Sequence, residues 1–243
     1  MKKVKNKKRY IVLIAILLLM TIVFGYMATG NYHADFDLSI IKQENPSIVI
    51  SEKSDYIKLS DGNVNDYALL FYPGGKVDYD AYIPFLSNIA INGCDVYLIK
   101  MPFNLAVFGV NRGDLILYSS LSYNHVYMAG HSLGGVMANR YALENKDLID
   151  GVIYYASYPD KEMAENQKSL LIYGSLDNVL DFEAVESNRI NLSKNYVELI
   201  IPGGNHYNFG NYGIQKGDNL PAISRETQQK TAAEATVEFI FNN

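Results

Sequence analysis

Short apolar runs alternate with segments of helical periodicity along most of the chain. The runs are bounded by polar turns, which predicts strands, whereas the segments between them have the wider spacing of helices. Two early runs, SIVIS and YIKLS, are expected to form a hairpin. Further strands are expected at YALLFY, DVYLIKM, HVYMAG, GVIYYAS, LLIYG and YVELII. Helices are expected near residues 79–92, 114–121, 133–144 and 181–192, and a final helix begins at Ser224.

Continuous apolar strands separated by helices predict an α/β fold with a mostly parallel central sheet and helices on both faces. Ligands of such sheets bind beyond the carboxyl ends of the strands, so the loops at those ends are where chemistry is expected. Only about a dozen residues separate GVIYYAS from LLIYG, which is too few to form an additional domain between these two strands. We therefore expect no cap domain over the sheet.

The most apolar segment lies at the N-terminus. Residues 1–9 hold six basic residues and no acidic one, and residues 10–29 are uncharged. A helix of this length spans about 30 Å, the thickness of a bilayer core, and its basic flank stays in the cytoplasm. The pattern predicts a cytoplasmic tail at 1–9, a transmembrane signal-anchor at 10–29, a tether at 30–46 and an extracytoplasmic α/β domain at 47–243. The alternative is a cleaved signal peptide and a secreted domain.

Composition excludes several classes of function. Hydrophobic residues make up 49% and charged residues 19% of the 243-residue chain, which is typical of a globular domain. Beyond residue 9 the chain carries 15 basic and 26 acidic residues, so nucleic-acid binding is not expected. The one cysteine, Cys94, cannot form an intrachain disulfide and is expected to pack in the core. The four histidines have no metal-ligand spacing, and no phosphate-binding motif is present, so neither a metal nor a cofactor is expected.

The stretch Gly130-His131-Ser132-Leu133-Gly134 fits G-x-S-x-G between a predicted strand and a predicted helix. A serine in such a turn has a strained backbone, and its hydroxyl projects above the sheet. Side chains at the two glycine positions would collide, and the helix N-terminus favours developing negative charge. The pattern predicts a nucleophilic Ser132; the alternative is a glycine-rich turn with an idle serine.

A serine nucleophile needs a base, and His206 is the candidate. The other histidines lie in the tether, at a strand start or in the turn itself (His33, His125 and His131). His206 follows the last predicted strand, where Gly203 and Gly204 free the backbone to turn back over the sheet.

The base needs an acid to orient it, and Asp177 follows the buried strand LLIYG. Asp160 after the preceding strand is an alternative, and Asp181 is another, although it suits a helix N-cap better. For the oxyanion we expect the N–H of Leu133 and, from the PGGK loop after YALLFY, the N–H of Gly75 or of the residue on either side of it. An ordinary tight turn is the alternative interpretation of that loop.

Together the PGG, GHSLGG, GSLD and GGNH motifs resemble the α/β-hydrolase superfamily, and in particular a small cap-less bacterial branch of unassigned substrate. The likeness extends from about residue 66 to the C-terminus. It implies that Ser132 attacks an acyl carbonyl, His206 transfers the proton and Asp177 orients the imidazole. Many esterases of this superfamily carry His-Gly-Gly where this chain has Pro73-Gly74-Gly75.

The expected activity is a membrane-anchored serine hydrolase that cleaves a small-molecule carboxylic ester or thioester through an acyl-enzyme. An amidase or peptidase could use the same residues, and a non-catalytic envelope binding domain is the alternative from another class. Apolar substrate lining is expected from two aromatic loops, although packing beneath the loops is an equal alternative. The residues concerned are Phe103, Leu105, Phe108, Tyr207, Phe209 and Tyr212.

Overall fold

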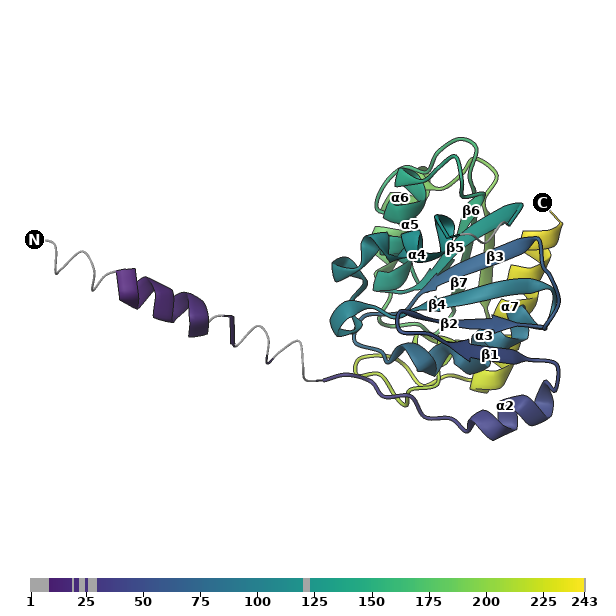
Figure 1. Cartoon of the computed structure of the whole chain (residues 1–243), viewed down its shortest axis with the longest axis horizontal. Helices are drawn as coiled ribbons and strands as arrows, with labels where there is room; N and C mark the ends of the chain where they lie inside the picture. The colour runs from purple at the N-terminus through teal and green to yellow at the C-terminus, as the bar shows by residue number, and fades with distance from the viewer. Residues whose placement is uncertain (1–8, 19, 22–24, 26–29, 120–122, 243) are drawn as a thin grey trace, which may run out of the picture. The chain divides into compact units, whose positions relative to one another are not determined.

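The computed structural model describes residues 9–18, 20–21, 25, 30–119 and 123–242. Within these residues, eight strands form one sheet in the order β1-β2-β4-β3-β5-β6-β7-β8. Figure 1 labels β1 to β7 of this sheet. The strands are β1 (Val49–Glu52), β2 (Tyr56–Ser60), β3 (Tyr67–Tyr72), β4 (Cys94–Ile99), β5 (His125–His131), β6 (Gly151–Tyr155), β7 (Lys168–Gly174) and β8 (Val197–Ile201).

The sheet is parallel from β4 through β3 to β8, and only β2 runs against its neighbours. β1 and β2 form the expected hairpin, with Val49 opposite Ser60. The predicted mostly parallel α/β sheet is therefore confirmed. Since the parallel strands all end at one edge, the loops after β3, β5, β6, β7 and β8 meet there.

The helices are α2 (Leu38–Glu44), α3 (Ile83–Ala90), α4 (Asp114–Leu117), α5 (Leu133–Glu144), α6 (Phe182–Asn188) and α7 (Arg225–Phe241). The segment expected to be helical from residue 79 begins with a 3₁₀ turn, Tyr79–Tyr82, before α3. α4 and α6 are shorter than expected. α7 begins where it was predicted, because the Ser224 hydroxyl accepts a hydrogen bond from the Thr227 N–H.

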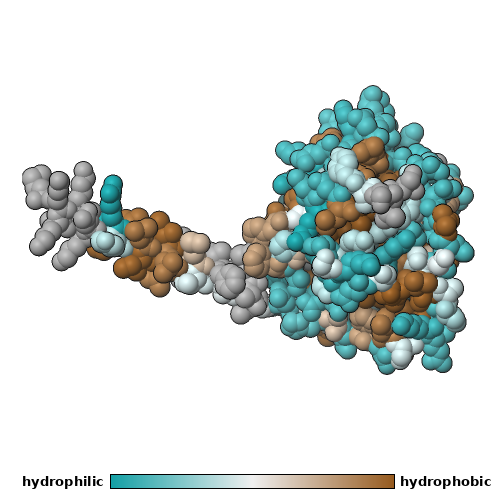
Figure 2. Space-filling view, viewed as in Figure 1, coloured by the Kyte–Doolittle hydropathy of each residue, from teal (hydrophilic) through white to brown (hydrophobic). Residues whose placement is uncertain are grey.

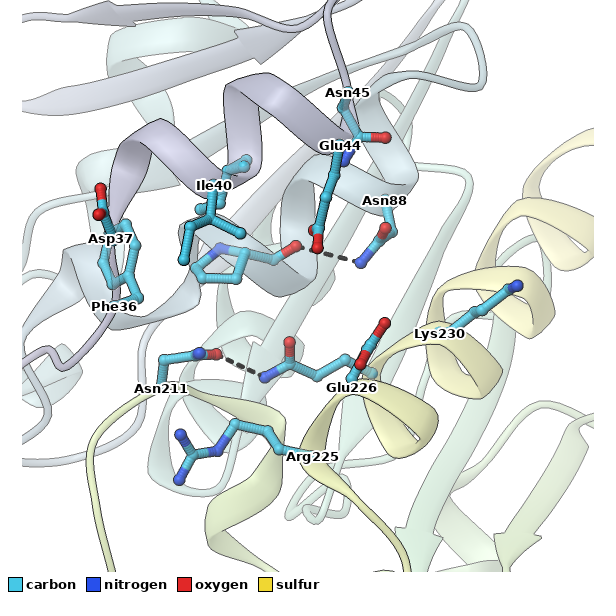
Figure 3. A pocket seen from close by; sticks show the side chains of 13 residues that line it. Phe36, Asp37, Ile40, Glu44, Asn45, Asn88, Asn211, Arg225, Glu226 and Lys230 are labelled. Carbon is cyan, nitrogen blue, oxygen red and sulfur yellow. Dashed lines mark hydrogen bonds between the residues drawn. The ribbon is translucent and has the colours of Figure 1, made fainter.

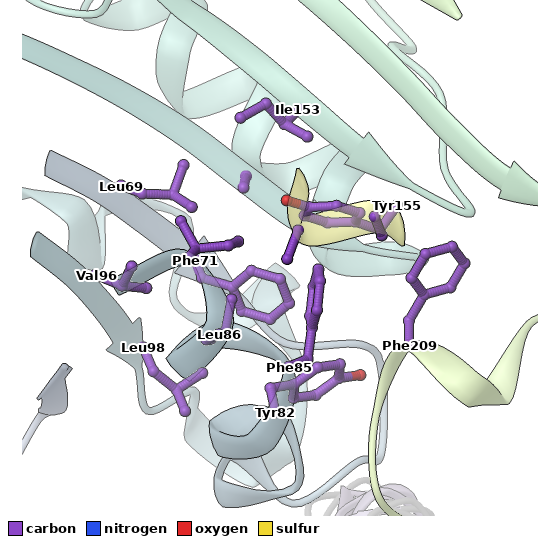
Figure 4. Close-up of a cluster of buried hydrophobic side chains, with 14 of the residues drawn as sticks. Leu69, Phe71, Tyr82, Phe85, Leu86, Val96, Leu98, Ile153, Tyr155 and Phe209 are labelled. Carbon is purple, nitrogen blue, oxygen red and sulfur yellow. The ribbon is translucent and has the colours of Figure 1, made fainter. Parts of the chain in front are cut away.

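Alternate residues of each strand contribute to two cores, one on each face of the sheet. On one face, Leu69 and Phe71 belong to a cluster with side chains of α3 and α7. On the other face, Ala68 and Leu70 belong to a cluster with side chains of α4, α5 and α6. Figure 4 shows the first cluster, in which the ring of Phe85 meets Tyr155 edge-on, with centroids 4.9 Å apart. Helices therefore cover both faces, as a largely buried parallel sheet requires.

Residues 1–31 form a unit of their own. Residues 9–18 are helical, and their side chains are largely hydrophobic (Figure 2). Among the described residues, no helix has both the length and the apolar character that a membrane crossing requires. The predicted anchor at 10–29 includes residues 19, 22–24 and 26–29, which lie outside the described set.

The segment 30–46, expected to be a tether, is instead ordered from Tyr32 onward and belongs to the same unit as the sheet. Tyr32 donates its N–H to the carbonyl of Lys76 at 2.7 Å and accepts from the N–H of Asp78 at 2.9 Å. Its ring also lies against that of Tyr212. α2 follows, capped by Asp37, and buries Ile41. Main-chain hydrogen bonds and a few apolar side chains therefore join this segment to the domain.

Candidate active site

Ser132 lies at the junction of β5 and α5, where it is the N-cap of the helix. Its backbone is in a strained conformation, with φ 51° and ψ −124°, as predicted for a serine in this turn. A Cβ at Gly130 would overlap the backbone of Gly134, and a Cβ at Gly134 would overlap the carbonyl of Tyr72. The two glycines therefore allow the turn to pack closely against the end of β3.

His206 and Asp177 lie in the loops after β8 and β7, and the structure brings them into contact. Nδ1 of His206 lies 2.8 Å from Oδ2 of Asp177, and both side chains are buried. The other carboxylate oxygen accepts hydrogen bonds from the N–H groups of Val179 and Leu180. The acid is thus held from both sides, and the imidazole is oriented with Nδ1 as the donor.

Ser132 and His206 line the same hollow, which has a volume of about 240 Å³. Nε2 of His206 is buried and has no hydrogen-bond partner in the described part of the chain. The remaining lining residues come from α5 and from the loops after β6 and β7: Leu133, Val136, Ala156, Ser157, Tyr158, Val179, Leu180 and Asp181. A buried imidazole nitrogen without a partner, beside a serine, is a site able to accept a proton.

The alternative acids and histidines have other partners. Asp160 binds the guanidinium of Arg140, with Nε of the arginine 2.9 Å from Oδ2. Asp181 caps α6 by accepting the N–H of Ala184. His33 contacts Asp78 and His125 contacts Asp150, each through Nδ1. Of the three acids weighed from the sequence, only Asp177 has a hydrogen bond to the His206 side chain among the described residues.

The second buried histidine, His131, joins three parts of the site. Its Nδ1 lies 2.9 Å from the hydroxyl of Tyr82, and its Nε2 lies 3.2 Å from the carbonyl of His206. Tyr82 in turn accepts the N–H of Gly74. Burial, and secondarily the neighbouring His206, lowers the pKa of His131 well below its usual value. A neutral ring protonated on Nε2 satisfies both contacts.

The PGGK loop after β3 lies beside the strand-to-helix turn at residues 130–135 that carries Ser132, here called the elbow. Gly74 donates its N–H to the hydroxyl of Tyr82, and Lys76 donates its N–H to the carbonyl of Asn104. Gly75 lies between them and is half-buried; a Cβ there would stand 3.2 Å from the side chain of Leu133. The N–H of Leu133, the first residue of α5, has no acceptor within the helix. These two N–H groups are the ones that were predicted for an oxyanion.

The aromatic residues predicted to line the substrate site have different surroundings. Phe103 and Phe108 meet edge-on and are 51% and 54% exposed, and neither lines the hollow beside Ser132. Tyr207 is only 4% exposed and packs in the core on the α3–α7 face. The position of Tyr207 in a loop suggested that it lines the substrate site. Its ring instead packs among the side chains of the core.

A second hollow, of about 360 Å³, lies among α2, α3 and α7 (Figure 3). Its lining mixes both signs of charge, including Asp37, Glu44, Arg225 and Lys230, and contains none of the three predicted triad residues. Although it is the larger of these two hollows, its described lining residues include no serine, cysteine or histidine. Within the described residues, no cluster of histidine, cysteine and carboxylate side chains is suited to hold a metal ion.

Three polar residues of the site were missed by sequence reasoning. Tyr82 carried no signal, because it lies within a segment of helical pattern. Asp218, in the loop before α7, accepts the main-chain N–H of His206 at 2.9 Å, and it likewise carried no signal. Ser157 donates its hydroxyl to the carbonyl of Ser132 at 2.7 Å, and its place just after β6 was a usable signal. A Cβ at Gly135 would overlap this hydroxyl, which explains the third glycine of the elbow.

A family model described as the alpha/beta hydrolase family matches residues 68–230, which include the elbow and all three predicted triad residues. The chain belongs to the alpha/beta hydrolase family. The resemblance inferred from the PGG, GHSLGG, GSLD and GGNH motifs is therefore confirmed. A search of curated protein sequences finds no match.

Solved alpha/beta hydrolase structures have the same fold at low sequence identity. A CIB-like hydrolase from Thermoplasma acidophilum is 20% identical, with a TM-score of 0.56 over 81% of this chain and 100% of that one. Dienelactone hydrolase from Anabaena variabilis is 15% identical, with a TM-score of 0.61 over 81% and 98%. Est1E from Butyrivibrio proteoclasticus is 14% identical, with a TM-score of 0.55 over 79% and 98%.

Proposed function

We propose that the protein is a serine hydrolase that cleaves a carboxylic ester or thioester through an acyl-enzyme. The observation that carries the proposal is the environment of His206. Its Nδ1 is held by Asp177, while its buried Nε2 lacks a partner and shares a hollow with Ser132. This is the arrangement that a general base for a serine nucleophile needs.

In the proposed reaction, Oγ of Ser132 attacks the acyl carbonyl as its proton passes to Nε2 of His206. Asp177 keeps the imidazole in the tautomer that can accept this proton and stabilises the resulting imidazolium. The tetrahedral intermediate collapses when His206 gives the proton to the leaving alcohol or thiol. Water then attacks the acyl carbon as His206 removes its proton. The bond from the acyl carbon to Oγ breaks when His206 returns that proton to Oγ, which releases the acid and restores Ser132.

The negative oxygen of the tetrahedral intermediate would be bound by the N–H groups of Leu133 and Gly75. Leu133 opens α5, so the partial positive charge of the helix N-terminus adds to its N–H. Gly75 is supported because the N–H groups of its two neighbours, Gly74 and Lys76, already have acceptors. Donors already in position stabilise the transition state without reorganisation.

The hollow beside Ser132 supports a small-molecule substrate. Its volume of about 240 Å³ is below the usual range for sites that enclose a drug-sized ligand, roughly 300–1,000 Å³. Its lining is largely apolar, with Leu133, Val136, Ala156 and Val179 among the side chains. An ester with a short acyl group is the simplest occupant.

A covalent probe and an ester substrate test this function. A fluorophosphonate should label the protein, and p-nitrophenyl acetate should be hydrolysed. Ser132→Ala should lose both properties, whereas Ser187→Ala, an exposed serine of α6, should retain both. Equal turnover by Ser132→Ala would reject the mechanism, and an unlabelled wild-type protein would favour a non-catalytic binding domain.

We also propose that residues 10–29 anchor the hydrolase domain to the membrane, with the domain outside the cytoplasm. The support is the uncharged apolar stretch after a basic tail. In cells that express the full chain, the protein should stay with the membrane pellet after alkaline carbonate extraction. A chain that begins at residue 30 should be released, and release of the full chain would exclude the anchor.

A further inference from the structure

The loops that carry the acid and the base come from two different strands, β7 and β8, and meet at one point. A Cβ at Gly174 would overlap the backbone of Gly204, so the two main chains touch there. Leu176 donates its N–H to the carbonyl of Gly204 at 2.8 Å. This contact lies close to the strand ends, whereas Asp177 and His206 meet in the outer parts of the loops.

The carboxylate of Asp218 lies between those outer parts and accepts four main-chain N–H groups. Oδ2 accepts from His206 at 2.9 Å and from Tyr207 at 3.1 Å. Oδ1 accepts from Asn178 and from Asn219, both at 2.9 Å. One carboxylate therefore binds the main chain of the base itself and that of the residue after the acid.

The turn that carries Asp218 is also tied back to the loop of the acid. Asn178 donates its side-chain amide to the carbonyl of Gly217 at 2.8 Å, and Asn219 donates its own to the carbonyl of Leu176 at 3.0 Å. With the bond from the Asn178 N–H to Asp218, three hydrogen bonds join this turn to residues 176–178. The turn acts as a brace between the two loops.

We propose that Asp218 is a positioning residue that sets the distance between Asp177 and His206 by binding the main chains of both loops. The inference rests on the proposed function, because it concerns the same acid and base. An ionised carboxylate suits the role, since it only accepts hydrogen bonds and offers enough lone pairs for four donors. In an asparagine at this position, an NH₂ group would replace one carboxylate oxygen. Two of the four N–H groups would then face a donor and lose their acceptor.

The test compares Asp218→Asn with Asp61→Asn in the full chain. Asp61 is a matched control, because its carboxylate also accepts a main-chain N–H, that of Asn63, in a loop before β3 at the other edge of the sheet. For Asp218→Asn we expect kcat for p-nitrophenyl acetate to fall about ten- to hundredfold with KM within about twofold, as for a base displaced by a fraction of an ångström to 1 Å. Asp61→Asn should keep both constants.

A proton resonance gives a second readout that does not depend on turnover. The proton that His206 Nδ1 donates to Asp177 should give a low-field ¹H signal in the wild-type protein and in Asp61→Asn. It should be lost or broadened in Asp218→Asn while the thermal unfolding curve stays cooperative. An unchanged signal and kcat in a folded Asp218→Asn protein would overturn the proposal.

If Asp218→Asn does not fold, Asn178→Ala decides the matter, because this exposed residue only ties the turn to the loop of the acid. A smaller fall in kcat, again without a change in KM, supports the brace, and wild-type kcat with an unchanged signal contradicts it. Ser132→Ala separates the two proposals. If it is inactive while Asp218→Asn is fully active, only the brace fails; if it is fully active, the proposed function itself fails.

Discussion

Asp177 and His206, 29 positions apart in the chain, lie with Oδ2 of the acid 2.8 Å from Nδ1 of the imidazole, in a buried contact. The contact occupies Nδ1 of the ring. The other ring nitrogen, Nε2, has no hydrogen-bond partner among the described residues, and His206 lines the same hollow as Ser132. It also distinguishes among the three acids that the sequence offered, because Asp160 and Asp181 have partners elsewhere.

The first prediction concerns this acid. Asp177→Asn should lower kcat for p-nitrophenyl acetate by about three to four orders of magnitude, because an amide no longer holds the tautomer that accepts the serine proton. Asp160→Asn, which removes a carboxylate bound to Arg140, should change kcat less than about threefold, the range expected for a surface ion pair. Steady-state kinetics of the two variants check this, and similar losses in both would mean that the acid is misassigned.

A second prediction concerns the hydroxyl of Tyr82. Tyr82→Phe leaves the buried N–H of Gly74 and Nδ1 of His131 without their partner, which should lower the free energy of unfolding by about 1–3 kcal/mol. Urea denaturation measures the change. Tyr118→Phe removes a hydroxyl bound to Asn145 at the exposed surface and should cost less than about 1 kcal/mol. Equal stability of the two variants would contradict the buried network.

The third prediction follows from the lowered pKa of His131. The folded protein keeps this ring neutral, whereas the unfolded chain binds a proton below about pH 6.5. Above that pH the ring is neutral in both states, so its protonation does not lower the free energy of unfolding. Below it, the free energy of unfolding should fall by about 1.4 kcal/mol per pH unit on account of this residue.

His131→Gln removes that dependence, so the variant should lose less stability than the wild type between pH 6.5 and 5. Urea unfolding at several pH values gives the two slopes. A wild-type slope in His131→Gln would show that the buried ring is not the source.

A fourth prediction concerns where a stable hydrolase fragment begins. A chain that starts at residue 36 lacks Tyr32, which makes two main-chain hydrogen bonds and an aromatic contact, and Asp35, which donates to Asn211. Compared with a chain that starts at residue 30, it loses these three hydrogen bonds and should be less stable by about 1.5–4.5 kcal/mol, at roughly 0.5–1.5 kcal/mol per bond. Thermal unfolding of the two fragments measures this difference. Equal midpoint temperatures would show that residues 30–35 do not contribute to the stability of the domain.

The elbow could be predicted because its requirements are local. Gly130, Ser132 and Gly134 are close in sequence, and the steric reason for each glycine is visible in the strand-to-helix pattern around it. The parallel sheet could be predicted for a similar reason, since an apolar run of strand length indicates burial on both faces whatever its neighbours are.

The contacts of single side chains across the fold could not be predicted in this way. Tyr207 and Phe103 both carried an aromatic signal in a glycine-rich or irregular loop, yet one is buried and the other half-exposed. Tyr32 lay in a segment too polar to suggest packing, yet it pairs with the loop after β3. In each case, whether the side chain is buried depends on which part of the fold, distant in sequence, its loop packs against.

The amino-acid sequence by itself determined the fold class, the serine turn and a choice of one histidine and three acids, because strand burial, turn sterics and the order of motifs act over short stretches. Only the tertiary structure decided that Asp177 faces His206, that His131 and Tyr82 join the base to the loop after β3, and that Asp218 lies between two loops. Those contacts join strand ends far apart in the chain, and the hydrophobic pattern specifies which strands are buried but not which polar groups meet at their ends.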